Sequence, residues 1–409
     1  MRKPEAKGPE VNLRDIPEDQ VAAYFENNPF PKGCCLTYPL NLQHMPRRGV
    51  VLRLLAQIPA TEKEKVTGLD LDYAELADED LPQIAAFFPT LQELSVGFEL
   101  SPEPLGCLVE ALPNLQSLGL RRLNLADSAD AHIERLTRAA QHGGLQNLST
   151  LLLLQTKVSA QVMENFFRAL PKLRELTVKG TMLDGHVPML LRAFEKRGAL
   201  GKLKYFGLGR GTGLSAENLK VLLTAFTGDA ANLDEFLDDE ERIETLGQVI
   251  QEGHLNQLVF LSLSHNQDIP PGLLAGMLGG LQNLQEIELN DMQLTDEHMR
   301  ALAEERKAGR LEGIRSFQIK ENPELSLHAV AEVAKGMKNL SSLGMIGMDL
   351  SGPSAQEFAV GWQELTSLNL TQSRLSEQAL RYFVSQKPAL KSLNLNDTDL
   401  TDGQLAVLA

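Results

Sequence analysis

The sequence of 409 residues lacks several features that mark particular classes of protein. Its three cysteines are a sparse and odd set that indicates no disulfide framework, so we expect a reducing, cytoplasmic compartment. It has no run of about 18 apolar residues, which predicts that no segment spans a membrane. Its first residues contain no apolar stretch of the kind that a secretory signal needs. A net charge of −15 argues against general nucleic-acid affinity.

The sequence also lacks the motifs that carry catalysis. H-E-x-x-H, paired C-x-x-C and G-x-S-x-G are all absent. The glycines of KYFGLGRGTGL (204–214) come without a Walker lysine and without G-x-G-x-x-G spacing. The acidic segment LDEFLDDEERIE (233–244) lacks EF-hand spacing and is expected to be a solvated face, or alternatively a docking site for a basic partner. We therefore predict that the protein is not an enzyme and has no catalytic residues, cofactor or metal.

What the sequence does contain is one leucine spacing, repeated along most of the chain. In LKSLNLNDTDL (390–400) the spacing is L-x-x-L-x-L-x-x-x-x-L. The alternating pair Leu393 and Leu395 predicts a short strand with one buried face. A strand this short needs a stack of copies to bury that face. The copies begin at Val66, Leu91, Leu115, Leu148, Leu173, Leu203, Leu258, Leu284, Ile314, Leu340, Leu365 and Leu390.

The residues after each strand indicate the subtype of the repeat. Ser376 and Glu377 suit a helix start, and Leu380 and Phe383 follow at helical spacing, so each copy predicts a strand, a turn and an α-helix. Over residues 66–409 this pattern resembles the ribonuclease-inhibitor-like class of leucine-rich repeats. The resemblance implies an α/β leucine-rich-repeat solenoid, a curved horseshoe with parallel strands on its concave face and helices on its convex face. We expect about thirteen units, one of them degenerate near 233–257.

The ninth position of the repeat departs from that class, which prefers Asn or Cys there. Asn266 and Asn322 fit this preference. Other units carry Ala74, Thr156, Thr181, Ser373 and Thr398. The bonds from this side chain to the backbone of the turn are therefore expected to be weaker or made differently.

The first 65 residues lack the repeat spacing. We expect residues 1–11 to be disordered because they are polar and charged, and residues 12–65 to form a helical N-terminal cap. Alternatively, LRDIPEDQVAAYF (13–25) loosely resembles the opening of an F-box, which implies that residues 12–58 recruit a ubiquitin ligase. The Ile-Pro-Glu of this segment is one residue tighter than the F-box motif.

The outward positions of the strands predict a binding surface. In the middle repeats these positions combine arginines with leucines and aromatic residues, which are typical of binding hot spots and exposed interfaces. Gly180, Gly207 and Gly209 are expected to leave room for a partner. We predict that a protein partner binds the concave face through Arg121, Arg122, Leu152, Leu154, Lys179, Tyr205, Arg210 and Phe260.

The function predicted from these observations is a non-catalytic scaffold for protein–protein interaction. The resemblance extends to the repeat domains of bacterial effector proteins, which implies an effector acting in the cytoplasm of a host cell. The alternative is an F-box-like substrate receptor of a ubiquitin ligase. We expect no nucleic-acid partner and no membrane. A monomer is expected rather than a C-terminal end-to-end dimer, because no segment of the sequence marks a self-complementary surface.

Overall fold

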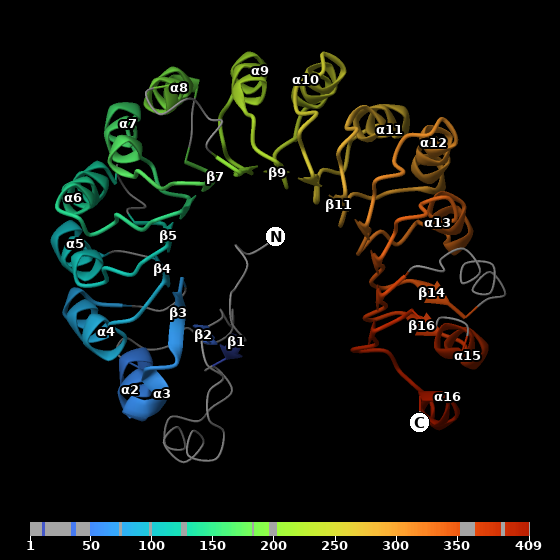
Figure 1. Ribbon diagram of the computed structural model, residues 1–409, viewed down its shortest axis with the longest axis horizontal. Coiled ribbons are helices and arrows are strands. Elements are labelled where there is room, and N and C mark those ends of the chain that lie inside the picture. The colour runs from blue at the N-terminus through green and yellow to red at the C-terminus, as the bar shows by residue number, and fades with distance from the viewer. Residues whose placement is uncertain are drawn as a thin grey trace. The chain divides into compact units, whose positions relative to one another are not determined.

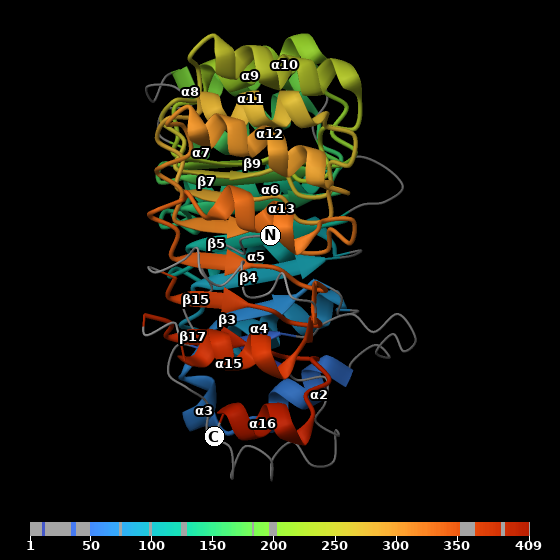
Figure 2. The ribbon, with the colours of Figure 1, turned by 90° about the vertical axis from the view of Figure 1, so that its right-hand side faces the viewer.

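A computed structural model describes residues 10–12, 34–37, 50–72, 76–97, 100–123, 129–181, 184–195, 203–351, 365–385 and 389–408. The chain divides into two compact units, Met1–Leu214 and Ser215–Ala409. In each unit, strands lie on the inner side and helices on the outer side (Figure 1). Figure 2 shows the same elements from the side, with strands and helices running roughly horizontally in successive layers.

In the first unit, strands β1 to β8 pair in parallel and in chain order. Its elements are β1 (Glu10–Asn12), β2 (Cys34–Thr37), α2 (Val50–Gln57), α3 (Ala60–Lys63), β3 (Val66–Leu71), η2 (Asp78–Asp80), α4 (Leu81–Phe87), β4 (Glu93–Gly97), α5 (Pro102–Glu110), β5 (Ser117–Arg121), α6 (Asp130–Gln141), β6 (Thr150–Leu154), α7 (Ala160–Ala169), β7 (Glu175–Lys179), η3 (Asp184–His186), α8 (Val187–Glu195) and β8 (Tyr205–Gly209).

The second unit repeats the arrangement, with β9 to β13, β15 and β17 paired in parallel and in chain order, and β14 paired with β16. Its elements are α9 (Ala216–Ala225), β9 (Ala230–Asn232), α10 (Glu240–Gln251), β10 (Phe260–Ser262), α11 (Pro271–Gly280), β11 (Glu286–Glu288), α12 (Asp296–Lys307), β12 (Ser316–Gln318), α13 (Leu327–Ala334), β13 (Ser342–Gly344), β14 (Asp349–Leu350), β15 (Ser367–Asn369), β16 (Arg374–Leu375), α15 (Glu377–Ser385), β17 (Ser392–Asn394) and α16 (Asp402–Leu408).

The strand registers confirm the predicted repeat spacing. Leu118 pairs with Leu94 on one side and Leu151 on the other, and all three are at most 2% exposed. In the second unit Leu261 pairs with Ile287 in the same way. Each strand therefore turns one face toward the helices, as a leucine-rich repeat requires. The chain is an α/β leucine-rich-repeat solenoid with parallel strands, as the sequence predicted.

The degenerate repeat lies slightly earlier than predicted. Strand β9 pairs with β10 with Ala231 opposite Leu261, which puts Leu233 in the register of Leu263. The sequence prediction treated Leu233 as the first leucine of the unit. It is the unit's last core position, just after the strand, and Ala231 stands where the other repeats have leucine, isoleucine or phenylalanine.

The region before the first repeat contains strands as well as helices. Helix α2 is part of the predicted helical cap, whereas residues 13–33 and 38–49, with the F-box-like segment 13–25, lie outside the described residues. Strands β1 and β2 extend the sheet beyond β3, with Leu36 paired to Leu69. The described part of the predicted helical cap thus continues the sheet, and Leu36 occupies a core position of an extra repeat.

At the ninth position of four units a hydroxyl group stands in place of asparagine, in Thr156, Thr181, Ser373 and Thr398. Asn266 donates to the carbonyls of Leu233 and Leu263 and accepts from the amide of Leu237 at 2.7 Å. Thr181 sits at the same position and donates weakly to the carbonyls of Leu153 and Lys179, at 3.2 and 3.1 Å. The turn is therefore bonded differently, as expected, with one hydroxyl in place of a carboxamide.

A second ladder of bonds, which the sequence analysis did not identify, links the helix starts. Three helical segments begin with Asp-x-His, and each histidine Nε2 bonds to a carbonyl of the preceding repeat: His132 to Leu100, His186 to Val158, and His298 to Ile269. In α16 the equivalent residue is Gln404, which donates to the Leu375 carbonyl at 2.5 Å. These side chains bond four of the repeats to the repeat before each of them.

Candidate functional site

The outward face of β3 to β8 changes from acidic to basic along the first unit. Toward its beginning stand Asp70, Asp72 and Glu93. Asp72 is 8% exposed, accepts a hydrogen bond from Ser95 Oγ and forms an ion pair with Arg121 at 3.1 Å. Arg121 is therefore committed to an internal ion pair and contributes less charge to a partner than the sequence analysis assumed.

The neighbouring Arg122 is held differently. Its backbone is left-handed, with φ of 51°, and its Nε donates to Oε1 of Gln155, which is also left-handed with φ of 52°. Few residues other than glycine and asparagine adopt this conformation readily. This bond fixes the guanidinium at the end of β5. The side chain is only half-buried and its bonding partner is neutral, so the positive charge and the other N–H donors can still serve a partner.

Two more cations occupy the same end of the next strands. Lys179 is the last residue of β7 and is half-buried, and Arg210 follows β8 and is exposed. Within the described part of the chain, no carboxylate forms an ion pair with either residue. We call Arg122, Lys179 and Arg210 the cation row.

The glycines do not leave the open room that the sequence analysis expected. A β-carbon on Gly209 would come within 2.6 Å of Lys179 Cγ, Cδ and Cε, so the stem of the lysine already lies over this glycine. At Gly207 it would lie 3.0 Å from Oγ1 of Thr177. Gly180 has a φ of 61°, which glycine adopts with less strain than other residues. The glycines at 207 and 209 thus let the protein's own side chains lie flat on the sheet.

The predicted apolar residues divide into two groups. Leu152 and Tyr205 are half-buried on the outward face of β6 and β8. Leu154, by contrast, is 5% exposed and Phe260 is 2% exposed, so neither presents the exposed apolar surface that was predicted. Phe260 also belongs to the second unit, whereas the other seven predicted residues lie in the first.

A local excess of positive charge in the sequence marks the stretch of chain that contains this face, although Arg168 and Arg192 of that stretch lie on helices α7 and α8 and pair with Glu164. Residues 168–210 contain ten lysines and arginines and three acidic residues, a net charge of +7. The remaining residues carry 29 basic and 51 acidic side chains, a net charge of −22. Besides Lys179 and Arg210, the exposed Arg174 and Lys204 immediately precede β7 and β8. Both ends of these two strands therefore carry cations.

The acidic segment 233–244 in the second unit has a structural use. Asp234 is 3% exposed and accepts bonds from Ser262 Oγ, the Ser264 amide and the Asn232 carboxamide. Asp239 caps helix α10 by accepting from the Arg242 amide at 2.8 Å. The first of these acidic residues is thus not solvated, contrary to the expectation, whereas Asp239 and the glutamates of α10 are exposed or half-buried.

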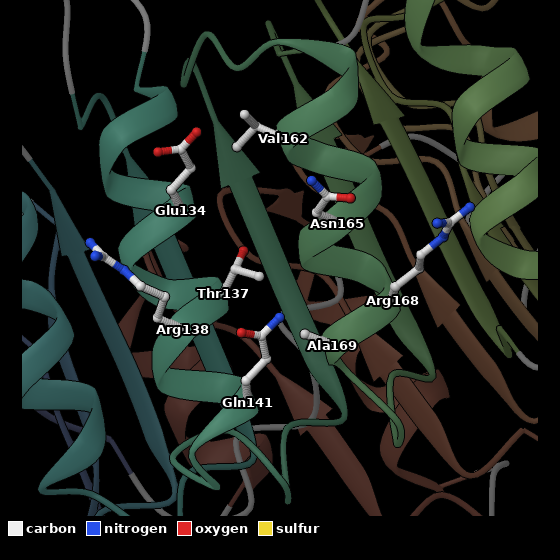
Figure 3. Close-up of a pocket in the computed structure, with 8 residues that line it drawn as sticks. All are labelled: Glu134, Thr137, Arg138, Gln141, Val162, Asn165, Arg168 and Ala169. Carbon is white, nitrogen blue, oxygen red and sulfur yellow. The ribbon is translucent and has the colours of Figure 1, made fainter.

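A groove of about 700 Å³ lies on the helical side of the first unit, between α6 and α7 (Figure 3). Thr137 and Val162 are buried, and Glu134, Asn165 and Arg168 are exposed. Arg168 extends toward α8 and away from the groove, and it pairs with the buried Glu164. The chemistry of this lining is mixed and does not favour one class of ligand.

Helices α5 and α6 share a network of charged side chains that includes an exposed thiol. Arg135 is 7% exposed at its side chain and pairs with Glu110 at 2.8 Å and Glu103 at 2.9 Å. The hydrogen bond from Arg135 holds the pKa of Glu110 below its ordinary value. Cys107 Sγ lies 3.7 Å from Arg135 and is exposed, whereas burial raises the pKa of Cys34 to about 11.

The described residues contain no group of three or more His, Cys, Asp or Glu side chains placed to hold a metal ion. No described helix combines the length and apolar character that crossing a membrane requires.

Comparisons with known proteins agree with the fold. No family model matches the sequence, and no curated protein matches it. A chain from the complex of Rad7 and Elc1 in yeast is 18% identical, with a TM-score of 0.51 and coverage of 95% of this chain and 87% of that one. The leucine-rich repeat-containing protein LegL7 from Legionella pneumophila is 13% identical, with a TM-score of 0.48 and coverage of 77% and 96%. The internalin InlF from Listeria monocytogenes is 18% identical, with a TM-score of 0.40 and coverage of 81% and 86%.

Proposed function

We propose that this chain is a protein-binding scaffold whose partner lies against the outward face of β5 to β8. The observation that carries the proposal is a set of ordered side chains that includes arginine and tyrosine, two of the residue types enriched at binding hot spots. Arg122 is fixed by Gln155, and Lys179 lies over Gly209. Leu152 of β6 and Tyr205 of β8 are half-buried on the same outward face.

The physical advantage of this face is that little has to be ordered when a partner binds. Immobilising a long, flexible side chain costs about 0.5–1.5 kcal/mol on association. Arg122 and Lys179 are already partly held by neighbouring residues. The proposal includes a cytoplasmic location, in agreement with the few cysteines of the sequence. It also includes action as a bacterial effector in a host cell, which rests on the family resemblance.

The test has two steps. The protein and its variants first capture proteins from lysate of candidate host cells, and the affinity of each variant for the purified partner is then measured. Leu152→Asp with Tyr205→Asp should abolish binding. Val384→Asp, at a 45% exposed position on α15, is the control and should retain it. Thermal melting must show that each variant is folded. A purified partner that binds both variants equally would contradict the proposed site.

A further inference from the structure

We propose that the segment recognised by this face is acidic and extended, and that it runs along β7 and β8. This inference rests on the proposed function and specifies the chemistry of the partner. Its basis is the arrangement of Arg174 and Lys204 at the start of these strands and of Lys179 and Arg210 at their end.

The spacing of the cations sets the shape of the segment. Tyr205 pairs with Glu175 in the parallel register, so Arg174 and Lys204 stand side by side at one end, and Lys179 stands beside Gly209 at the other. The strand between the two ends spans about 17 Å, because each residue of a strand advances about 3.3 Å. A segment of about five extended residues therefore reaches from one pair of cations to the other.

The surface between the two ends is flat and polar. Thr177 and Gly207 form its middle, and Tyr205 is half-buried beside them. The carboxylate on this stretch is Glu175, whose Oε2 accepts a hydrogen bond from Thr150 Oγ1 at 3.1 Å. That bond holds the carboxylate of Glu175 toward β6, and the four cations at the strand ends outnumber this one negative charge.

The same charge distribution favours a short acidic peptide over a nucleic acid. The basic surface covers two repeats, and the outward face of β3 and β4 carries Asp70, Asp72 and Glu93. A nucleic acid carries a phosphate at every nucleotide, so a long strand would extend its charge over these carboxylates. The −22 charge of the rest of the chain opposes any long polyanion. A peptide can confine its acidic residues to the basic surface.

The experiment measures fluorescence anisotropy of a labelled peptide of about ten glutamates, with a glutamine peptide of the same length and a uridine oligonucleotide as comparison probes. Because the protein as a whole is anionic, its net charge predicts repulsion, and binding of the glutamate peptide requires a local basic site. We expect the glutamate peptide to bind at about 50 mM salt and to weaken markedly at about 300 mM, and the glutamine peptide not to bind.

The variants locate the site. Lys179→Glu with Arg210→Glu should weaken binding of the glutamate peptide about tenfold or more. Lys335→Glu with Lys338→Glu makes the same change in net charge at exposed positions of the second unit and should change affinity less than about twofold. If the variant with Lys179→Glu and Arg210→Glu does not fold, the variant with Lys179→Gln and Arg210→Gln is measured in its place. Equal weakening by both pairs, no binding of the glutamate peptide, or tighter binding of the oligonucleotide would overturn the inference.

The purified partner separates this inference from the proposed function. If Leu152→Asp with Tyr205→Asp abolishes partner binding but Lys179→Glu with Arg210→Glu does not, the site is correct and the acidic segment is wrong. If neither pair affects the partner, the proposed site itself fails.

Discussion

Replacing His298 by alanine should destabilise the second unit, because this one ring serves two purposes. Its Nε2 donates to the buried carbonyl of Ile269 in the preceding repeat at 3.0 Å. Its Nδ1 accepts the amide of Thr295 at 3.1 Å and also lies 3.0 Å from the Thr295 hydroxyl. The ring is 9% exposed and sits at the third position of α12. It thus caps its own helix and bonds that helix to the repeat before it.

The expected loss is the sum of two effects. Losing a helix cap costs about 1 kcal/mol. Leaving the Ile269 carbonyl buried without a donor costs about 1–3 kcal/mol. We therefore expect His298→Ala to lower the free energy of unfolding by about 2–4 kcal/mol. Repeats interact mainly with their neighbours, so the loss should appear first as faster hydrogen exchange in α11 and α12.

His298→Gln is the sharper comparison, since the protein already uses glutamine for the same purpose. Gln404 accepts the amide of Thr401 at 2.7 Å and donates to the Leu375 carbonyl. The glutamine variant should therefore lose less than half of what the alanine variant loses in urea denaturation. His328→Ala, at an exposed position of α13, should cost less than about 0.5 kcal/mol. Equal losses of stability in the glutamine and alanine variants would refute the bonding argument, because packing would then account for the whole contribution of His298.

Two further outcomes follow from the helical side of the protein. Gly106→Ala should destabilise the fold by about 1–3 kcal/mol, because the new methyl would meet the buried Arg135 guanidinium. Gly276→Ala should stabilise it by up to about 1 kcal/mol, because the new methyl would meet nothing within 4 Å. Urea denaturation measures both changes, and the same sign for both would contradict this account. Iodoacetamide should label Cys107 in the native protein and spare Cys34, whose buried thiol has a pKa of about 11; rapid labelling of Cys34 in peptide mapping would show that the first strands open readily.

The fold was predictable because the leucine spacing and the strand register both follow from the burial of alternate residues of each strand. A strand with Leu118 and Leu120 buried allows one alignment with its neighbours, since a slip by one residue would turn both leucines outward. Where the spacing degenerates, the prediction lost its precision. Ala231 fills a core position with a small residue, and the larger Leu233 then appeared to begin the unit.

The proposed binding surface was harder to predict because outward positions are not held to one residue type by packing. Repeat position alone placed Leu154 on the open face, yet it is buried there by its neighbours. It also treated Arg121 and Arg122 as equivalent, although Asp72, 49 residues earlier in the chain, pairs with Arg121. Such pairings depend on which side chains meet across strands, and this is set by register and rotamer together. Local charge was the better signal, because the ten basic residues of 168–210 exceed its three acidic residues and leave a net charge of +7. An acidic protein that keeps this excess on two adjacent repeats bears the repulsion between those cations, and an acidic partner would relieve it.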